Sequence, residues 1–67
     1  MNTIDARGLS CPQPVLLTKK AMMANDSITV LVDNNVAFEN ISRYAKNSGF
    51  ALSFLQDGED FSITINK

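Results

Sequence analysis

Residues 50–65, FALSFLQDGEDFSITI, carry the clearest structural pattern in the chain. Apolar and polar residues alternate on both sides of the central Asp57-Gly58 pair. Such alternation is typical of strands with one apolar face, and Asp-Gly favours a tight hairpin because glycine tolerates the positive φ of the turn. We therefore predict an antiparallel hairpin of two strands, 50–55 and 61–65, whose apolar faces carry Phe50, Leu52, Phe54, Phe61, Ile63 and Ile65.

The residues before this hairpin predict a strand and a helix. Residues 27–32 alternate and are rich in β-branched side chains, which predicts a strand with Ile28, Val30 and Val32 facing inward. Residues 36–47 place apolar side chains on one face and charged ones on the other, as in an amphipathic helix. Asn34 or Asn35 can cap its start, and Gly49 can close its end in a left-handed conformation.

The N-terminal part repeats the order of strand and helix, with a short strand over 3–7 and a helix from Pro12 to about Ala24. A strand, a helix and a second strand form a right-handed parallel crossover, and the hairpin extends the sheet antiparallel. We predict an α/β fold, a two-layer β-α-β-α-β-β sandwich. Its four-stranded mixed sheet carries two helices on one face, in a single domain over 1–67. Leu31, Ala51 and Leu55 are apolar on the open face, either as ordinary surface residues or as a docking patch.

Charge and composition exclude several classes of function. Six basic and seven acidic residues give a net charge of −1, so bulk electrostatics predict binding to neither nucleic acid nor an anionic membrane. No membrane-spanning run or signal peptide is visible, so we expect the cytoplasm. The sequence has one cysteine, which can make neither an intrachain disulfide nor a zinc site, and it has no histidine, the commonest metal ligand. We predict no metal, no cofactor and a monomer.

The chemically informative stretch is residues 7–14, RGLSCPQP. Proline suits the first position of a helix, so Pro12 is expected there and Cys11 at the N-cap. The positive end of the helix favours a thiolate, which lowers the pKa of the Cys11 thiol below its usual value. Pro12 and Pro14 remove amide donors, so the Gln13 N–H is the one best placed to reach the sulfur. We expect moderate activation.

Cys11 is then a nucleophile with neither a histidine base nor a second cysteine in the chain. Such a sulfur can accept a sulfur atom as a persulfide and pass it on, since S–S bonds exchange by direct attack of a thiolate. The alternative is a small buried side chain or a structural cap. Cysteine is not a preferred N-cap, however, and Ser10 beside it is a better one, which favours the functional interpretation.

The first predicted helix carries a second candidate surface. Leu16 and Met23 project on the side opposite its apolar face, between Lys19 and Lys20. This arrangement is either a docking surface for a partner or a solvated helix face, and we favour docking because Cys11 is the predicted N-cap of the same helix. Asp5 and Arg7 share one face of the first strand, where a structural pair is favoured over a role of Arg7 in holding anionic sulfur.

These residues resemble the TusA/SirA/YedF family of small sulfur-carrier proteins. The resemblance rests on Asp5–Val15, on Thr18–Ala21, on Val32-Asp33-Asn34 and on Gly49. It implies the same two-layer fold and a persulfide on Cys11, received from a cysteine desulfurase or similar donor and passed to an acceptor protein. Arg7, Gly8, Pro12, Gln13 and Pro14 would support the active loop. Destinations in the family include tRNA thiolation, cofactor maturation and sulfur oxidation.

Within the family, Gln13 and the stretches 32–35 and 39–43 are most similar to the N-terminal domain of YedF-type proteins, which are associated with selenium metabolism. Those proteins usually continue into a DsrE-like domain, so residues 1–67 are either an excised domain or a stand-alone carrier. We expect a sulfurtransferase-like sulfur carrier. The alternative is a non-catalytic interaction or regulatory module in which Cys11 is a structural cap. A module that binds nucleic acid is disfavoured by the charge balance.

Overall fold

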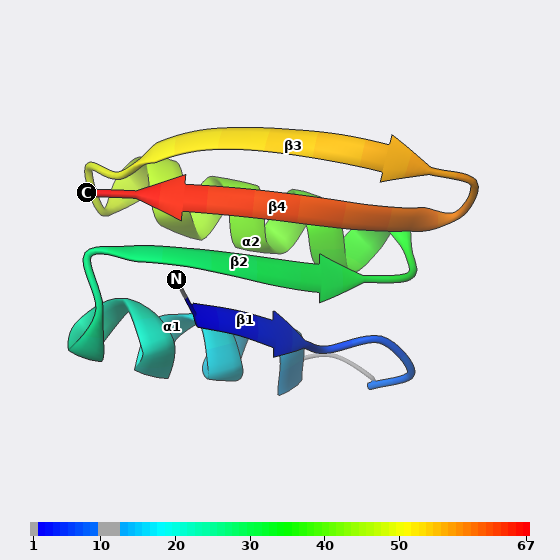
Figure 1. Cartoon of the computed structure of the whole chain (residues 1–67), viewed down its shortest axis with the longest axis horizontal. Coiled ribbons are helices and arrows are strands. Elements are labelled where there is room, and N and C mark those ends of the chain that lie inside the picture. The colour runs from blue at the N-terminus through cyan, green and yellow to red at the C-terminus, as the bar shows by residue number, and fades with distance from the viewer. Residues whose placement is uncertain (1, 10–12) are drawn as a thin grey trace.

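The computed structural model, which describes residues 2–9 and 13–67, contains one mixed sheet and two helices (Figure 1). The elements follow the chain as β1 (Asn2–Asp5), α1 (Gln13–Ala24), β2 (Ser27–Val32), α2 (Asn35–Asn47), β3 (Ala51–Asp57) and β4 (Asp60–Asn66). The strand order is β1-β2-β4-β3, with β1 parallel to β2 and β4 antiparallel to both of its neighbours. The predicted β-α-β-α-β-β order and mixed sheet are confirmed.

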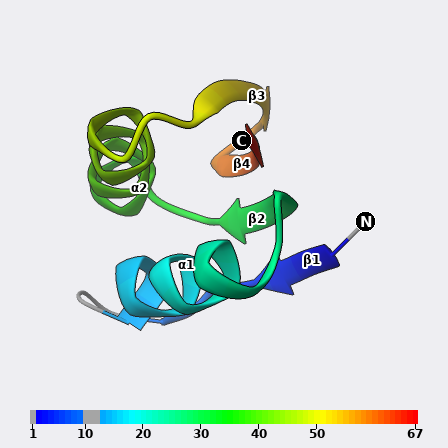
Figure 2. The ribbon, with the colours of Figure 1, turned by 90° about the vertical axis from the view of Figure 1, so that its left-hand side faces the viewer.

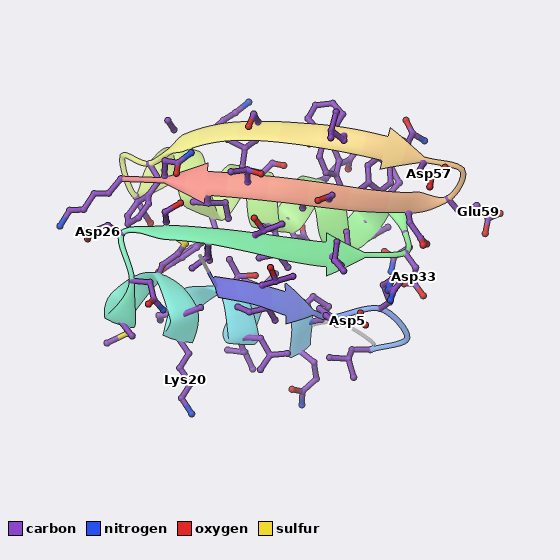
Figure 3. All side chains as sticks on the ribbon, viewed as in Figure 1. Asp5, Lys20, Asp26, Asp33, Asp57 and Glu59 are labelled. Atoms are coloured by element: carbon purple, nitrogen blue, oxygen red, sulfur yellow. The ribbon has the colours of Figure 1, made fainter. Side chains whose placement is uncertain are left out.

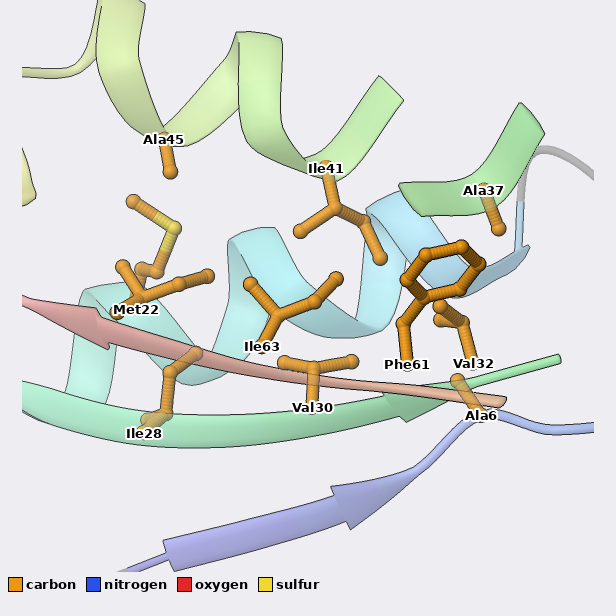
Figure 4. Close-up of a cluster of buried hydrophobic side chains, with 11 residues drawn as sticks. Ala6, Met22, Ile28, Val30, Val32, Ala37, Ile41, Ala45, Phe61 and Ile63 are labelled. Carbon is orange, nitrogen blue, oxygen red and sulfur yellow. The ribbon is translucent and has the colours of Figure 1, made fainter. Parts of the chain in front are cut away.

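Both helices lie on the same side of the sheet (Figure 2), which confirms the two-layer architecture. The core fills the space between the layers (Figure 4). Its largest side chains come from the two central strands, with contributions from both helices: Ile28, Val30, Val32, Phe61, Ile63, Ile65, Ile41 and Met22. The central strands supply most of the core because every inward side chain on them is covered by a helix.

The ends of α2 follow from local hydrogen bonding. Asn34 is the N-cap, and its side-chain oxygen accepts the N–H of Ala37 at 2.8 Å. At the other end Gly49 has φ +83°, and the Phe50 N–H reaches the Ala45 carbonyl at 3.0 Å, as in a Schellman motif. Both predicted end residues are confirmed. The helix begins one residue earlier than predicted, at Asn35.

The hairpin is present, with its turn one residue later than predicted. Asp57 pairs with Asp60, so Gly58 and Glu59 form the loop. Gly58 has φ +65°, and no described residue other than glycine has a positive φ, which is the pattern of a type II′ turn. This turn continues the strand twist, and therefore β3 extends to Asp57, beyond the predicted end at residue 55.

Phe54 lies on the predicted apolar face of the hairpin, but the edge position of β3 leaves it partly exposed. Phe54 lies on the helix side and its ring is 4.6 Å from that of Phe38, yet 49% of the residue is exposed. The reason is that β3 has a neighbour only on its β4 side. Leu55, on the open face, is 77% exposed.

Within the described residues no helix is long and apolar enough to cross a membrane.

One buried group in α2 has no partner among the described atoms. Ser42 is 9% exposed, and its Oγ makes no hydrogen bond within this part of the chain. Replacing Ser42 by alanine should raise the free energy of unfolding by about 1 kcal/mol, because alanine is the better helix former and buries no polar atom. Urea denaturation would measure this, with exposed Ser53→Ala as the control that changes little. A destabilised Ser42→Ala would contradict the prediction.

Candidate functional site

The candidate site is the loop between β1 and α1, and its first residues are fixed by Asp5. Arg7 donates to the Asp5 carboxylate from its backbone N–H at 3.1 Å and from Nε and Nη2 at 2.9 Å each. The side-chain hydrogen bonds of Arg7, followed by its backbone one, lower the pKa of Asp5 to about 2. The same contacts raise the pKa of Arg7 above its ordinary value. β1 therefore ends at Asp5, two residues earlier than predicted.

Arg7 also reaches the start of β4. Its Nη1 lies 3.4 Å from Oδ2 of Asp60, so one guanidinium is shared between two carboxylates from distant parts of the chain. All three side chains are about half exposed, so these ion pairs add little to stability. The Asp5–Arg7 pair is therefore present, and a role of Arg7 in holding anionic sulfur stays a prediction.

Gly8 is held by a residue to which the sequence analysis gave no role. Its N–H donates to Oδ2 of Asp33 at 2.9 Å, and Asp33 directly follows β2. Gly8 has φ +80°, a left-handed conformation that glycine adopts at little cost. The predicted parallel pairing of the first two strands could have indicated this contact. Residues that follow the carboxyl ends of two parallel strands meet at the same end of the sheet, as Gly8 and Asp33 do.

The first turn of α1 is anchored by Pro14. This residue is buried, and its carbonyl accepts the hydroxyl of buried Thr18 at 2.8 Å. Gln13 beside it is exposed. The sequence analysis predicted Pro14 in the first turn but not its burial. Ser10, Cys11 and Pro12 lie outside the described residues, and so do the predictions of Cys11 as N-cap and Pro12 as first helical residue.

The predicted docking residues share the solvent side of α1. Leu16 is 51% exposed and Met23 81% exposed, and Lys19 and Lys20 are exposed as well. Figure 3 shows Lys20 directed away from the sheet. These four residues, called the α1 stripe below, therefore form one accessible surface on the helix that follows the loop.

Carboxylates gather at the end of the sheet from which the loop departs. Asp5, Asp33, Asp57 and Glu59 lie there, whereas Asp26 lies at the opposite end (Figure 3). Among residues 2–9 and 13–67, no group of acidic side chains is arranged to hold a metal ion.

Comparison with known proteins gives consistent matches over the whole chain. The family model described as "Sulfurtransferase TusA" matches residues 2–67. A Methanocaldococcus jannaschii protein, named as a proposed sulfur carrier, is 38% identical in an alignment 71 positions long that covers 100% of this chain and 95% of that protein. The crystal structure of a SirA-like protein from Desulfitobacterium hafniense superposes with a TM-score of 0.91 at 37% identity, covering 98% of this chain and 96% of that one.

Proposed function

This chain belongs to the TusA sulfurtransferase family, and from that premise we propose that it is a sulfur carrier that holds the transferred sulfur as a persulfide on Cys11. The observation that carries the proposal is the family match over residues 2–67, which includes the stretch from Arg7 to Pro14. Cys11 is the one thiol in the sequence, so a covalent sulfur intermediate has a single possible site.

The proposed transfer needs no base or metal from this chain. The Cys11 thiolate attacks the outer sulfur of a persulfide on the donor enzyme, forming a new S–S bond. The S–S bond in the donor breaks, and the donor cysteine leaves as a thiolate. The acceptor then takes the outer sulfur by the same exchange, and Cys11 leaves as a thiolate. Arg7, Gly8 and Pro14 make the described hydrogen bonds at the two ends of the loop. We propose that Pro12 and Gln13 support the same loop.

The proposed partners are proteins. We propose a cysteine desulfurase or similar enzyme as donor and a sulfur-relay protein as acceptor, in tRNA thiolation, cofactor synthesis or selenium metabolism. The exposed α1 stripe supports docking beside the loop, because its apolar residues lie between two lysines. The YedF-type similarity of residues 32–35 is the support for a selenium connection. A lone thiol stays free in a reducing compartment, so the proposal places this relay in the cytoplasm.

Intact-protein mass spectrometry tests the proposal. The protein would be incubated with a cysteine desulfurase and cysteine, without reductant. We expect a mass gain of one sulfur atom that dithiothreitol removes, and no such gain in Cys11→Ser. Wild-type protein that stays unmodified with several desulfurases, while its thiol still titrates, would contradict desulfurase loading. Equal loading of Cys11→Ser would also contradict the role of Cys11.

A further inference from the structure

Asp33 links the start of the loop to the segment between β2 and α2. We propose that Asp33 is a positioning residue for Cys11, acting through its hydrogen bond to the Gly8 N–H. The inference rests on the proposed carrier function and adds a residue to its machinery. Asp33 lies at the junction of β2 and α2, 25 residues away from Gly8 in sequence.

The sheet itself holds the chain only up to Ala6. The N–H of Ala6 donates to the Leu31 carbonyl at 2.8 Å, which is the last ladder-like bond between the two segments. Beyond Ala6, two described polar interactions join residues 7–9 to distant parts of the chain. They are the Arg7–Asp60 ion pair at 3.4 Å and the Gly8–Asp33 hydrogen bond at 2.9 Å. The Gly8–Asp33 bond is the shorter one and involves the backbone, so it constrains the path of the chain more directly.

Asp33 is itself held in place. Its second oxygen, Oδ1, accepts the side-chain N–H of Asn34 at 3.3 Å, and Asn34 caps α2. The helix that Asn34 begins packs Ala37, Ile41 and Ala45 into the core. The Asp33 carboxylate therefore connects the Gly8 amide to a helix start that is fixed by core packing.

Gly8 directs its amide to this acceptor because of its backbone conformation. A Cβ at Gly8 would meet no atom within 4 Å, so space does not require glycine here. The value of φ, +80°, does require it, since side-chain-bearing residues rarely adopt that conformation. The turn is thus set locally, and Asp33 fixes where the turn lies relative to the sheet.

This anchor matters for Cys11 because of chain length. Cys11 follows Gly8 by three residues, and three residues reach at most about 10 Å. The Gly8–Asp33 bond and the burial of Pro14 therefore fix the two points between which the chain carries Cys11. A sulfur transfer between two proteins requires the reacting atoms to meet in a narrow geometry, so a loosened loop lowers its rate.

The variants Asp33→Ala and Asp33→Asn separate hydrogen bonding from charge. Alanine removes both acceptor oxygens, whereas asparagine keeps one acceptor oxygen for the Gly8 N–H, removes the charge and replaces the oxygen that faces Asn34 by a donor NH2 group. Glu59→Ala is the matched control: it removes one negative charge at the same end of the sheet, from an exposed turn residue. Each variant would first be checked for a melting temperature close to that of the wild type.

Two measurements then decide the proposal. The first is amide hydrogen exchange by NMR at Gly8 and Leu9. We expect exchange about tenfold faster in Asp33→Ala and little changed in Asp33→Asn and Glu59→Ala. The second is the steady-state rate of sulfur loading from the desulfurase. We expect kcat to fall about tenfold in Asp33→Ala with KM for the carrier unchanged, and asparagine to restore most of the loss.

The outcomes are distinguishable from failure of the proposed function. The positioning role would be overturned if Asp33→Ala took up sulfur at the wild-type rate although its Gly8 amide exchanged faster. Unchanged exchange of the Gly8 amide in Asp33→Ala would overturn it as well. A loss in Asp33→Asn equal to that in Asp33→Ala would assign the effect to the charge or to the contact with Asn34, and would also overturn the positioning role. If wild-type protein takes up no sulfur, the carrier function fails, and the positioning role of Asp33 in sulfur transfer fails with it, whereas the exchange data report on the hydrogen bond alone.

Discussion

Ile63→Ala is expected to remove about 3 kcal/mol from the free energy of unfolding, because Ile63 is fully buried on central strand β4. Its cross-strand neighbours are Val30 on β2 and Phe54 on β3, so the cavity would open in the middle of the sheet. A domain of 67 residues has a total stability of about 3 to 10 kcal/mol. The substitution would therefore remove about a third or more of the free energy of unfolding. Urea denaturation followed by circular dichroism measures the loss.

Leu55→Ala is the matched control for that experiment. Leu55 lies on β3 beside the same strand, but on the open face, and is 77% exposed. We expect it to change the free energy of unfolding by less than about 0.5 kcal/mol. A loss below about 1 kcal/mol for Ile63→Ala, or an equal loss for both variants, would contradict a core placed between the sheet and the helices.

The double variant Leu16→Gln/Met23→Gln is expected to slow sulfur loading by at least about tenfold if the α1 stripe docks the donor. Glutamine keeps the length and helix propensity of both side chains, and it adds no charge beside Lys19 and Lys20. Both residues are largely exposed, so the melting temperature should stay close to that of the wild type. The loading rate at low carrier concentration, where docking limits it, is the quantity to measure.

Leu55→Gln is the control for this second experiment. It makes the same kind of change on the opposite, open face of the sheet. Unchanged loading in Leu55→Gln and slow loading in the double variant would locate docking on α1. The reverse result would place docking on the sheet face, where the sequence also left a docking patch open as an alternative.

Several local features were predictable because each depends on neighbouring residues. The presence of the C-terminal hairpin follows from alternation and a glycine, and the ends of α2 follow from an asparagine cap and Gly49. The outward position of Leu16 and Met23 follows from helical periodicity alone. Cys11 stands out from its proline context, and its role remains a prediction because residues 10–12 lie outside the described part of the chain.

The remaining features depend on contacts between segments that are distant in sequence. Nothing local indicates that β4 inserts between β2 and β3, because that order is set by which strand can cover the most apolar surface under both helices. The half-exposure of Phe54 follows from this order, since it leaves β3 at the edge.

Composition, periodicity and turn chemistry were enough to predict the element types and the two layers, and to single out Cys11 as the one candidate nucleophilic thiol. The tertiary structure was needed to bring Asp33 onto Gly8, Asp60 onto Arg7 and Pro14 into the core. The physical reason is that the helix, strand or turn propensity of a residue depends on the residue itself and its neighbours in sequence. Its hydrogen-bonding partner across the sheet, in contrast, exists only after the strands have taken their order and register.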